Sequence, residues 1–260
     1  MDITSLQNPR VKHIVKLRED KRQRQKDGLL LAEGYDEIQF AISSGHKPQT
    51  LLSSPELASR QLAFPSAETL TVSRPVFEKM SYRDNPDGWL AVFPIPRMDL
   101  ESVSLLTENP LVIVAESIEK PGNLGAILRT ADAARVDALL VCDLRVDLWN
   151  PNVVRSSRGT VFSVPVVECD NASVLDWLKA NKIQVLAATP SAEAMYSDVD
   201  MTQPTAIAVG TEDEGLTDFW MSNADVKVKI PMAGKVNSLN VSVSTALIVY
   251  EAVRQRGISR

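Results

Sequence analysis

Three segments of the chain place glycine or polar residues directly after an apolar run. The run LVIVA is followed by ESIEKPGNLGAILRTADA, the run TAIAV by GTEDEGLTDFW, and the run VKVKI by PMAGKVNSLNVSVSTA. If the apolar runs are parallel strands, the residues after them lie at the carboxyl edge of a sheet, where α/β proteins bind their ligands. These three loops are therefore the candidate ligand site.

The first of these loops opens a helix through Gly122, Asn123 and Gly125. Such a helix start offers free backbone N–H groups and lets a ligand approach the backbone closely. The glycines do not follow the G-x-G-x-x-G order of dinucleotide-binding proteins, and no Walker lysine pattern follows them. A nicotinamide-dependent or phosphate-loop enzyme is therefore disfavoured.

The second loop carries consecutive carboxylates at Glu212, Asp213 and Glu214. Such a cluster suits a cationic ligand or a metal ion. No second cluster of histidines or aspartates matches it, and His13 and His46 both lie in the N-terminal part of the chain. We therefore expect no metal centre.

The elements that must position these loops alternate between strand and helix. The C-terminal part has predicted strands at 111–117, 138–143, 183–189, 205–210 and 226–232, and predicted helices at 122–135, 174–181 and 238–256. This alternation predicts a mostly parallel sheet covered on both faces. Residues 29–93 read as a small α/β domain, and the proline-containing segment 94–110 as a linker, with the boundary near 97–107.

Composition places the chain among ordinary globular proteins, with 260 residues, 44% hydrophobic and 23% charged. Two cysteines cannot form a disulfide framework, and no run approaches the 18 apolar residues of a membrane span. We therefore expect a cytoplasmic protein without a membrane partner. The net charge of −5 argues against a uniformly basic, nucleic-acid-coating protein.

A basic helix is predicted between residues 10 and 26, where lysines and arginines outnumber the two acids Glu19 and Asp20. Its apolar residues suggest one packed face. The basic face either faces water only or contacts phosphates. On the second interpretation the contacting residues are Arg10, Lys16, Arg18, Arg22 and Arg24.

Together, NLGAILRTADA, VGTEDEGL and IPMAGKVNSLNVSVSTALIVYEAVRQR resemble the three signature motifs of the SPOUT superfamily, in its SpoU or TrmH-type branch. The resemblance covers residues 108–258. The stretches SLQNPRVKHIVKLR and LLLAEGYDEI also resemble the small substrate-binding domain of some members. The resemblance implies an RNA substrate-binding domain at 1–97 and a methyltransferase domain at 107–260, the latter with a C-terminal trefoil knot.

The resemblance further implies a homodimer that uses S-adenosylmethionine to methylate ribose 2′-hydroxyls of rRNA or tRNA. By motif matching, the cofactor-binding residues are Gly210, Ile230 and Leu239, and the catalytic residues are Asn123, Arg129, Glu212, Ser238 and Asn240. Each has a structural alternative. Asn123 and Ser238 could be helix caps, Glu212 a carboxylate near a helix start, and Ile230 and Leu239 core residues.

Arg129 is the residue hardest to explain structurally, because its neighbours in the predicted helix are apolar or small and an unpaired buried charge is costly. The family's first-motif arginine is described as a general base. Deprotonating a guanidinium at pH 7 costs roughly 7 kcal/mol, which favours a clamp on the RNA phosphate and the developing alkoxide. The sequence leaves base and clamp open.

Two other functions compete. An RNA-binding protein without transfer activity would not be expected to keep all five polar motif residues. A SPOUT enzyme that methylates a base nitrogen is disfavoured by the NVSVSTA ending, which is typical of the ribose branch.

Overall fold

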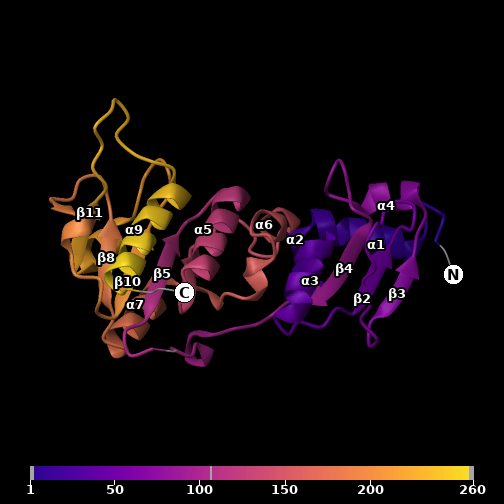
Figure 1. Cartoon of the computed structure of the whole chain (residues 1–260), viewed down its shortest axis with the longest axis horizontal. Helices are drawn as coiled ribbons and strands as arrows, with labels where there is room; N and C mark the ends of the chain where they lie inside the picture. The colour runs from indigo at the N-terminus through magenta and orange to yellow at the C-terminus, as the bar shows by residue number, and fades with distance from the viewer. Residues whose placement is uncertain (1–2, 106, 258–260) are drawn as a thin grey trace. The chain divides into compact units, whose positions relative to one another are not determined.

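The computed structural model describes residues 3–105 and 107–257. Its contacts divide the chain into two units (Figure 1). One contains the residues up to 97 together with 147–163, and the other contains 98–146 together with the residues from 164 onward. The contiguous domains predicted from sequence differ from this division, because residues 147–163 pack with the N-terminal unit.

The N-terminal unit is a four-stranded sheet with helices. Its elements are α1 (Pro9–Glu19), α2 (Lys21–Asp27), β1 (Leu29–Glu33), α3 (Tyr35–Ser43), β2 (Thr50–Ser53), β3 (Glu68–Thr71), α4 (Arg74–Met80), β4 (Trp89–Pro94), α6 (Pro151–Ser156) and the 3-10 turn η2 (Thr160–Phe162). The strand order is β1-β4-β2-β3, antiparallel except for the β2/β3 pair. The predicted small α/β domain is thus present.

The basic N-terminal segment forms two helices instead of one. Asp20 adopts an extended backbone, with φ −114° and ψ 112°, and its side chain accepts a hydrogen bond from the backbone N–H of Arg22. A short acidic side chain favours capping the next helix over continuing the first. Val11, Ile14 and Leu17 of α1 are buried, as the apolar face predicted.

Residues 147–163 are fixed to the N-terminal unit by a buried ion pair. Arg24 is only 2% exposed, and its Nε and Nη2 donate to Oδ2 of Asp147 at 2.8 and 2.5 Å. Further along the segment, Phe162 packs against the rings of His46 and Phe93. The alternation of strands and helices gives no sign of these long-range contacts.

The C-terminal unit is a seven-stranded sheet, in which every strand pair is parallel across the described residues. Its elements are η1 (Leu100–Ser102), β5 (Leu111–Glu116), α5 (Pro121–Ala133), β6 (Ala138–Cys142), β7 (Val166–Cys169), α7 (Asn171–Ala180), β8 (Gln184–Ala188), β9 (Ala194–Met195), η3 (Tyr196–Asp198), β10 (Thr205–Val209), α8 (Asp218–Asn223), β11 (Val226–Lys229) and α9 (Val241–Gln255). The strand order is β7-β6-β5-β10-β8-β11-β9.

Helices cover both faces of this sheet, as predicted. Val112 and Val114 of β5 pack in one cluster with Leu178 of α7 and Trp220 of α8. Helices α5 and α9 lie side by side on the opposite face (Figure 1). With both faces covered, the central strands are buried along their whole length, which is why their sequences are continuous apolar runs.

Candidate active site

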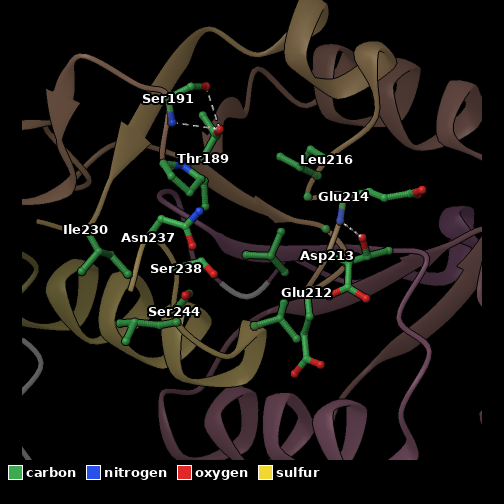
Figure 2. A pocket seen from close by; sticks show the side chains of 18 of the residues that line it. Thr189, Ser191, Glu212, Asp213, Glu214, Leu216, Ile230, Asn237, Ser238 and Ser244 are labelled. Carbon is green, nitrogen blue, oxygen red and sulfur yellow. Dashed lines mark hydrogen bonds between the residues drawn. The ribbon is translucent and has the colours of Figure 1, made fainter. Parts of the chain in front are cut away.

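Three neighbouring strands end at one cavity. Strands β10, β8 and β11 are adjacent in the sheet, and the residues after each strand line a cavity of about 560 Å³ together with the chain leading into α9 (Figure 2). This volume lies within the 300–1,000 Å³ common for small-molecule sites. The cavity occupies the carboxyl edge of the sheet, where the sequence predicted a ligand.

The loop from Gly210 to Gly215 is tightly closed. Thr211 and Gly215 exchange both backbone hydrogen bonds, at 3.0 and 3.2 Å. A Cβ atom at position 210 would lie 2.0 Å from the carbonyl oxygen of Gly215, so only glycine fits there. Gly215 has φ +73°, a left-handed conformation that also favours glycine. This closure fixes the direction of the carboxylates in between.

The predicted cofactor-binding residues Gly210, Ile230 and Leu239 all line this cavity. So does Ser238, which Figure 2 shows beside Asn237. The alternative of Ser238 as a cap of the closing helix is wrong, because α9 is capped by Asn240. The fold of the C-terminal unit brings these residues together.

A polar cluster next to the cavity joins all three motif loops. Asn123 donates from Nδ2 to Oε1 of Glu212 at 2.8 Å. Asn240 donates from its Nδ2 to the same oxygen and also to Oδ1 of Asn123, the latter at 3.1 Å. Lys120 forms an ion pair with the other carboxylate oxygen, and the hydrogen bonds from Lys120 and Asn123 hold the pKa of Glu212 below its usual value.

The local structure explains how each member of the cluster is oriented. Pro121 occupies the first turn of α5, where its missing N–H is harmless. Asn123 follows it inside the helix, so it is not the cap, which is Lys120. Asn240 accepts from the backbone N–H of Ser242 through Oδ1, leaving its Nδ2 for the cluster.

Arg129 lies apart from this cluster. It follows Asn123 by six positions in α5, which corresponds to about 9 Å along the axis and a rotation of about 120°. Its side chain is exposed. The predicted cost of burying an unpaired charge therefore does not apply here, because the side chain faces outward from the apolar side of α5.

Glu116 is a functional candidate that the sequence reading missed. This carboxylate is fully buried at the end of β5. It accepts from the backbone N–H and hydroxyl of Thr217 at 2.8 and 2.7 Å and from Nδ2 of Asn171 at 3.0 Å. Asn171 in turn accepts from the indole of Trp220. The network ties β5 to the start of α8 and so holds the loop before it. A lone acid ending an apolar strand was the available signal.

The predicted phosphate-contacting residues lie in different surroundings. Arg10, Lys16 and Arg22 are exposed, and Arg10 pairs with Glu68. Arg18 is half-buried and donates to the backbone carbonyls of Lys79 and Ser81. The assignment of Arg24 to the RNA surface is wrong, because its guanidinium is buried against Asp147.

No group of three or more histidine, cysteine or acidic side chains in the described ranges is arranged to hold a metal ion. Within residues 3–105 and 107–257, every helix is too short or too polar to cross a membrane.

Comparison with known proteins identifies the family. Residues 110–250 match the SpoU rRNA Methylase family, and residues 8–91 match the MRM3-like substrate binding domain. The chain is 32% identical to a 23S rRNA (uridine(2479)-2'-O)-methyltransferase of Streptomyces viridochromogenes, over 91% of this chain and 86% of that protein. It is 29% identical to the 23S rRNA (guanosine(2553)-2'-O)-methyltransferase RlmP of Bacillus subtilis, covering 95% and 97%.

Solved structures agree in both units. A crystal structure of an RNA 2'-O ribose methyltransferase superposes with a TM-score of 0.85 at 41% identity, over 99% of this chain and 100% of the other. The AdoMet complex of the SpoU methyltransferase AviRb from Streptomyces viridochromogenes gives a TM-score of 0.87 at 30% identity, covering 98% and 100%. The chain therefore belongs to the SpoU rRNA methylase family.

Proposed function

We propose that the cavity and the adjoining cluster of the C-terminal unit transfer a methyl group to ribose 2′-hydroxyls of RNA. The observation that carries this assignment is the convergence of Asn123, Glu212 and Asn240, one from each motif, beside a cavity at the carboxyl edge of the sheet. S-adenosylmethionine is the cofactor. Relatives of this chain act on 23S rRNA, and we infer rRNA as the substrate here, with tRNA as the other candidate.

The residues present fit S-adenosylmethionine. Gly210 lets the loop close on Gly215 at the wall of the cavity, and Ile230 and Leu239 line the cavity with apolar side chains beside main-chain groups that can hold the adenosine. Asp213 and Glu214 line the same cavity, where carboxylates attract the positive charges of the cofactor. When bound, the cofactor supplies an electrophilic methyl group.

The polar cluster acts by position and charge. Glu212 binds Asn123 and Asn240 together and so fixes the amide groups beside the cavity. Because these amides and the Lys120 cation are already ordered, the polar groups around the ribose oxygen need little reorientation when negative charge develops on that oxygen. Arg129, exposed on α5, is proposed to clamp the RNA phosphate with its two-pronged guanidinium.

We infer a homodimer that packs through α9. Val243, Leu247 and Tyr250 are 47%, 38% and 48% exposed and recur at the spacing of one helix face. In the same helix, Ile248 is fully buried and Val253 is half-buried. The exposed apolar stripe is thus narrow and consists of every third or fourth residue.

The trefoil knot and a cytoplasmic location also remain proposals. Residues 188–191, 209–216 and 237–239 line one cavity, so the chain entering α9 lies beside the loops that follow β8 and β10. That proximity supports a threaded C-terminal segment, which general topology rules would not predict.

The activity is tested with purified protein, radiolabelled S-adenosylmethionine, and either rRNA or tRNA from cells lacking the gene. We expect label in rRNA, recovered after alkaline hydrolysis as resistant dinucleotides, because a 2′-O-methyl group removes the hydroxyl that attacks the phosphodiester. Label recovered in mononucleotides would indicate methylation of a base. Calorimetry should show binding of S-adenosylhomocysteine and none of NAD.

A further inference from the structure

The N-terminal unit contains a second cavity of about 620 Å³. Its described lining is polar apart from one aromatic ring, and consists of Glu37, Tyr82, Arg83, Asp84, Asn85 and Arg155. The loop between α4 and β4 supplies 82–85, α3 supplies the glutamate, and α6 supplies Arg155. Arg155 belongs to the segment 147–163 and lies outside the residues matched to the substrate-binding domain.

The loop that lines this cavity is fixed at its beginning by a buried carboxylate. Glu33, 5% exposed at the end of β1, accepts from the hydroxyl of Ser81 at 2.5 Å and from the backbone N–H of Tyr82 at 2.6 Å. The hydroxyl oxygen of Ser81 also accepts from the backbone N–H of Arg83 at 3.0 Å. Hydrogen bonds to a charged group are among the stronger ones, so this turn is rigid.

The other end of the loop is fixed as well. Asp87 accepts from the backbone N–H groups of Tyr35 at 2.7 Å and Trp89 at 3.2 Å. Gly88 has φ +86°, and a Cβ there would lie 2.5 Å from the backbone of Ala58. The loop is therefore held at both ends, and the fold itself fixes the positions of residues 82–85 between them.

The groups in the middle of the loop are free. Tyr82 is 44% exposed, and the side chains of Asp84, Asn85 and Arg155 are exposed. Within the described ranges, the side chains of these last three make no hydrogen bond or ion pair. By contrast Arg83 is engaged, with Nη2 donating to the carbonyl of Glu33 at 3.0 Å and pairing with Glu37 at 2.7 Å.

The charge balance of the cavity decides what it can hold. Arg83 and Arg155 are opposed by Glu37 and Asp84, so the lining has no net positive charge to attract a phosphate. The cavity instead offers one stacking surface, the exposed ring of Tyr82. Next to it, a carboxylate, an amide and a guanidinium supply both hydrogen-bond donors and acceptors. Those are the groups by which proteins hold an unstacked RNA base.

We propose that this cavity binds an unpaired nucleobase of the RNA substrate, stacked on Tyr82 and hydrogen-bonded by Asp84, Asn85 and Arg155. This inference rests on the proposed function only in that the substrate is RNA. On this proposal, the bases of the RNA are recognised by the loop between α4 and β4 and by α6. The basic residues of α1 and α2 attract the RNA backbone independently of its sequence. Phosphate contacts give affinity and register, and base contacts give choice.

The test compares two fluorescent single-stranded RNAs of 12 nucleotides, one carrying all four bases and one abasic throughout, by anisotropy. Tyr82→Ala should weaken binding of the base-bearing RNA about tenfold, and of the abasic RNA less than twofold, since stacking requires a base. Tyr82→Phe keeps the ring and should stay within twofold of wild type. Arg155→Gln should weaken the base-bearing RNA about fivefold. Lys179→Gln, an exposed cation on α7 outside both cavities, is the matched control.

Four results would overturn the proposal. Equal affinity of the wild type for both RNAs would show that no base is held. An equal loss of affinity for both RNAs in Tyr82→Ala would show that Tyr82 supports the fold or contacts phosphate. A tenfold loss for Tyr82→Phe would show that the hydroxyl, and not stacking on the ring, makes the contribution. A wild type that binds neither RNA while still binding S-adenosylhomocysteine would contradict RNA recognition itself and not only this cavity.

Discussion

Asn240 caps helix α9 with one atom of its amide and reaches Glu212 with the other. Its Oδ1 accepts from the backbone N–H of Ser242 at 3.0 Å, while its Nδ2 donates to Oε1 of Glu212. The start of α9 and the geometry of the polar cluster are therefore set by a single side chain. A substitution that keeps the cap and loses the contact to Glu212 therefore tests the contribution of Asn240 to activity separately from its contribution to the stability of α9.

Asn240→Ser is the variant that does so. Serine caps helices about as well as asparagine but cannot reach Glu212, so we expect a thermal midpoint close to wild type and a fall in kcat of about 100-fold. Asn240→Ala should lose the same activity and about 1 kcal/mol of stability in addition. A serine variant with wild-type turnover would show that the contact to Glu212 is dispensable.

The far end of α9 is held by a carboxylate whose pKa is depressed. Hydrogen bonds from Arg254, and next from Gln255, lower the pKa of Glu251 to about 2 from its ordinary 4.5. Gln255 in turn donates to the carbonyl of Val199 and accepts from the backbone N–H of Met201. Glu251 thus supports the docking of α9 through its neighbour.

Because the folded-state pKa lies below the unfolded value, the charged Glu251 contributes stability that is complete above pH 4.5 and is lost as the pH falls toward 2. Glu251→Gln should therefore be less stable than wild type at pH 6, and this difference should shrink steadily between pH 4.5 and 2. Urea unfolding across this range measures it. A difference that is independent of pH would mean that the contribution of Glu251 is not electrostatic.

The sequence predicted the elements well where burial alone decides them. The continuous apolar runs became buried parallel strands. Loops after strands were predicted to form the site because strand direction fixes which edge they share. What the sequence could not show is long-range pairing: Arg24 looks like any exposed cation until Asp147, 123 positions later, is placed against it.

Two further revisions have local causes. A run of basic residues carries no sign of where a helix is interrupted unless a capping residue is recognised, and Asp20 is that residue here. For Arg129, the apolar neighbours in the sequence did not show which way its side chain points. Asn123 and Arg129 are six positions apart in α5, and side chains at that spacing point to different sides of a helix.

The buried pair between Arg24 and Asp147 predicts a stability effect without an effect on RNA. Arg24→Gln leaves the carboxylate buried without a cation, and we expect a loss of about 3 kcal/mol in the free energy of unfolding. Arg22→Gln, on the exposed face of the same helix, should stay within about 0.5 kcal/mol of wild type. Denaturant titration of the two variants distinguishes them.

The same two variants separate electrostatic attraction from folding. If Arg22 touches a phosphate of single-stranded RNA, Arg22→Gln should reduce the slope of log affinity against log salt by about 0.7. Arg24→Gln should leave that slope unchanged at temperatures where it is folded. A flattened slope for Arg24→Gln alone would contradict the buried position of its guanidinium.

The exposed stripe on α9 predicts the oligomeric state. Leu247→Glu places a charge in the middle of Val243, Leu247 and Tyr250, and because Leu247 is partly exposed the monomer itself should remain folded. Sedimentation velocity at micromolar concentration should give a dimer for wild type and a monomer for the variant. Lys179→Glu introduces a carboxylate on α7, away from the stripe, and should remain dimeric. A monomeric wild type with full activity would exclude this interface.

Arg129 gives the sharpest test of mechanism, because a clamp and a base respond oppositely to lysine. A clamp needs the planar, two-pronged guanidinium, so Arg129→Lys should be nearly as inactive as Arg129→Ala. A general base must give up its proton first, and an ammonium does so more readily than a guanidinium, so a lysine base would retain or raise the rate. Single-turnover transfer with saturating RNA measures this difference directly.

Binding of S-adenosylhomocysteine should be unchanged in both variants, since Arg129 lies outside the residues that line the cofactor cavity. We expect a fall in kcat of at least 100-fold for both, which places the contribution of Arg129 in the transition state and not in ground-state binding.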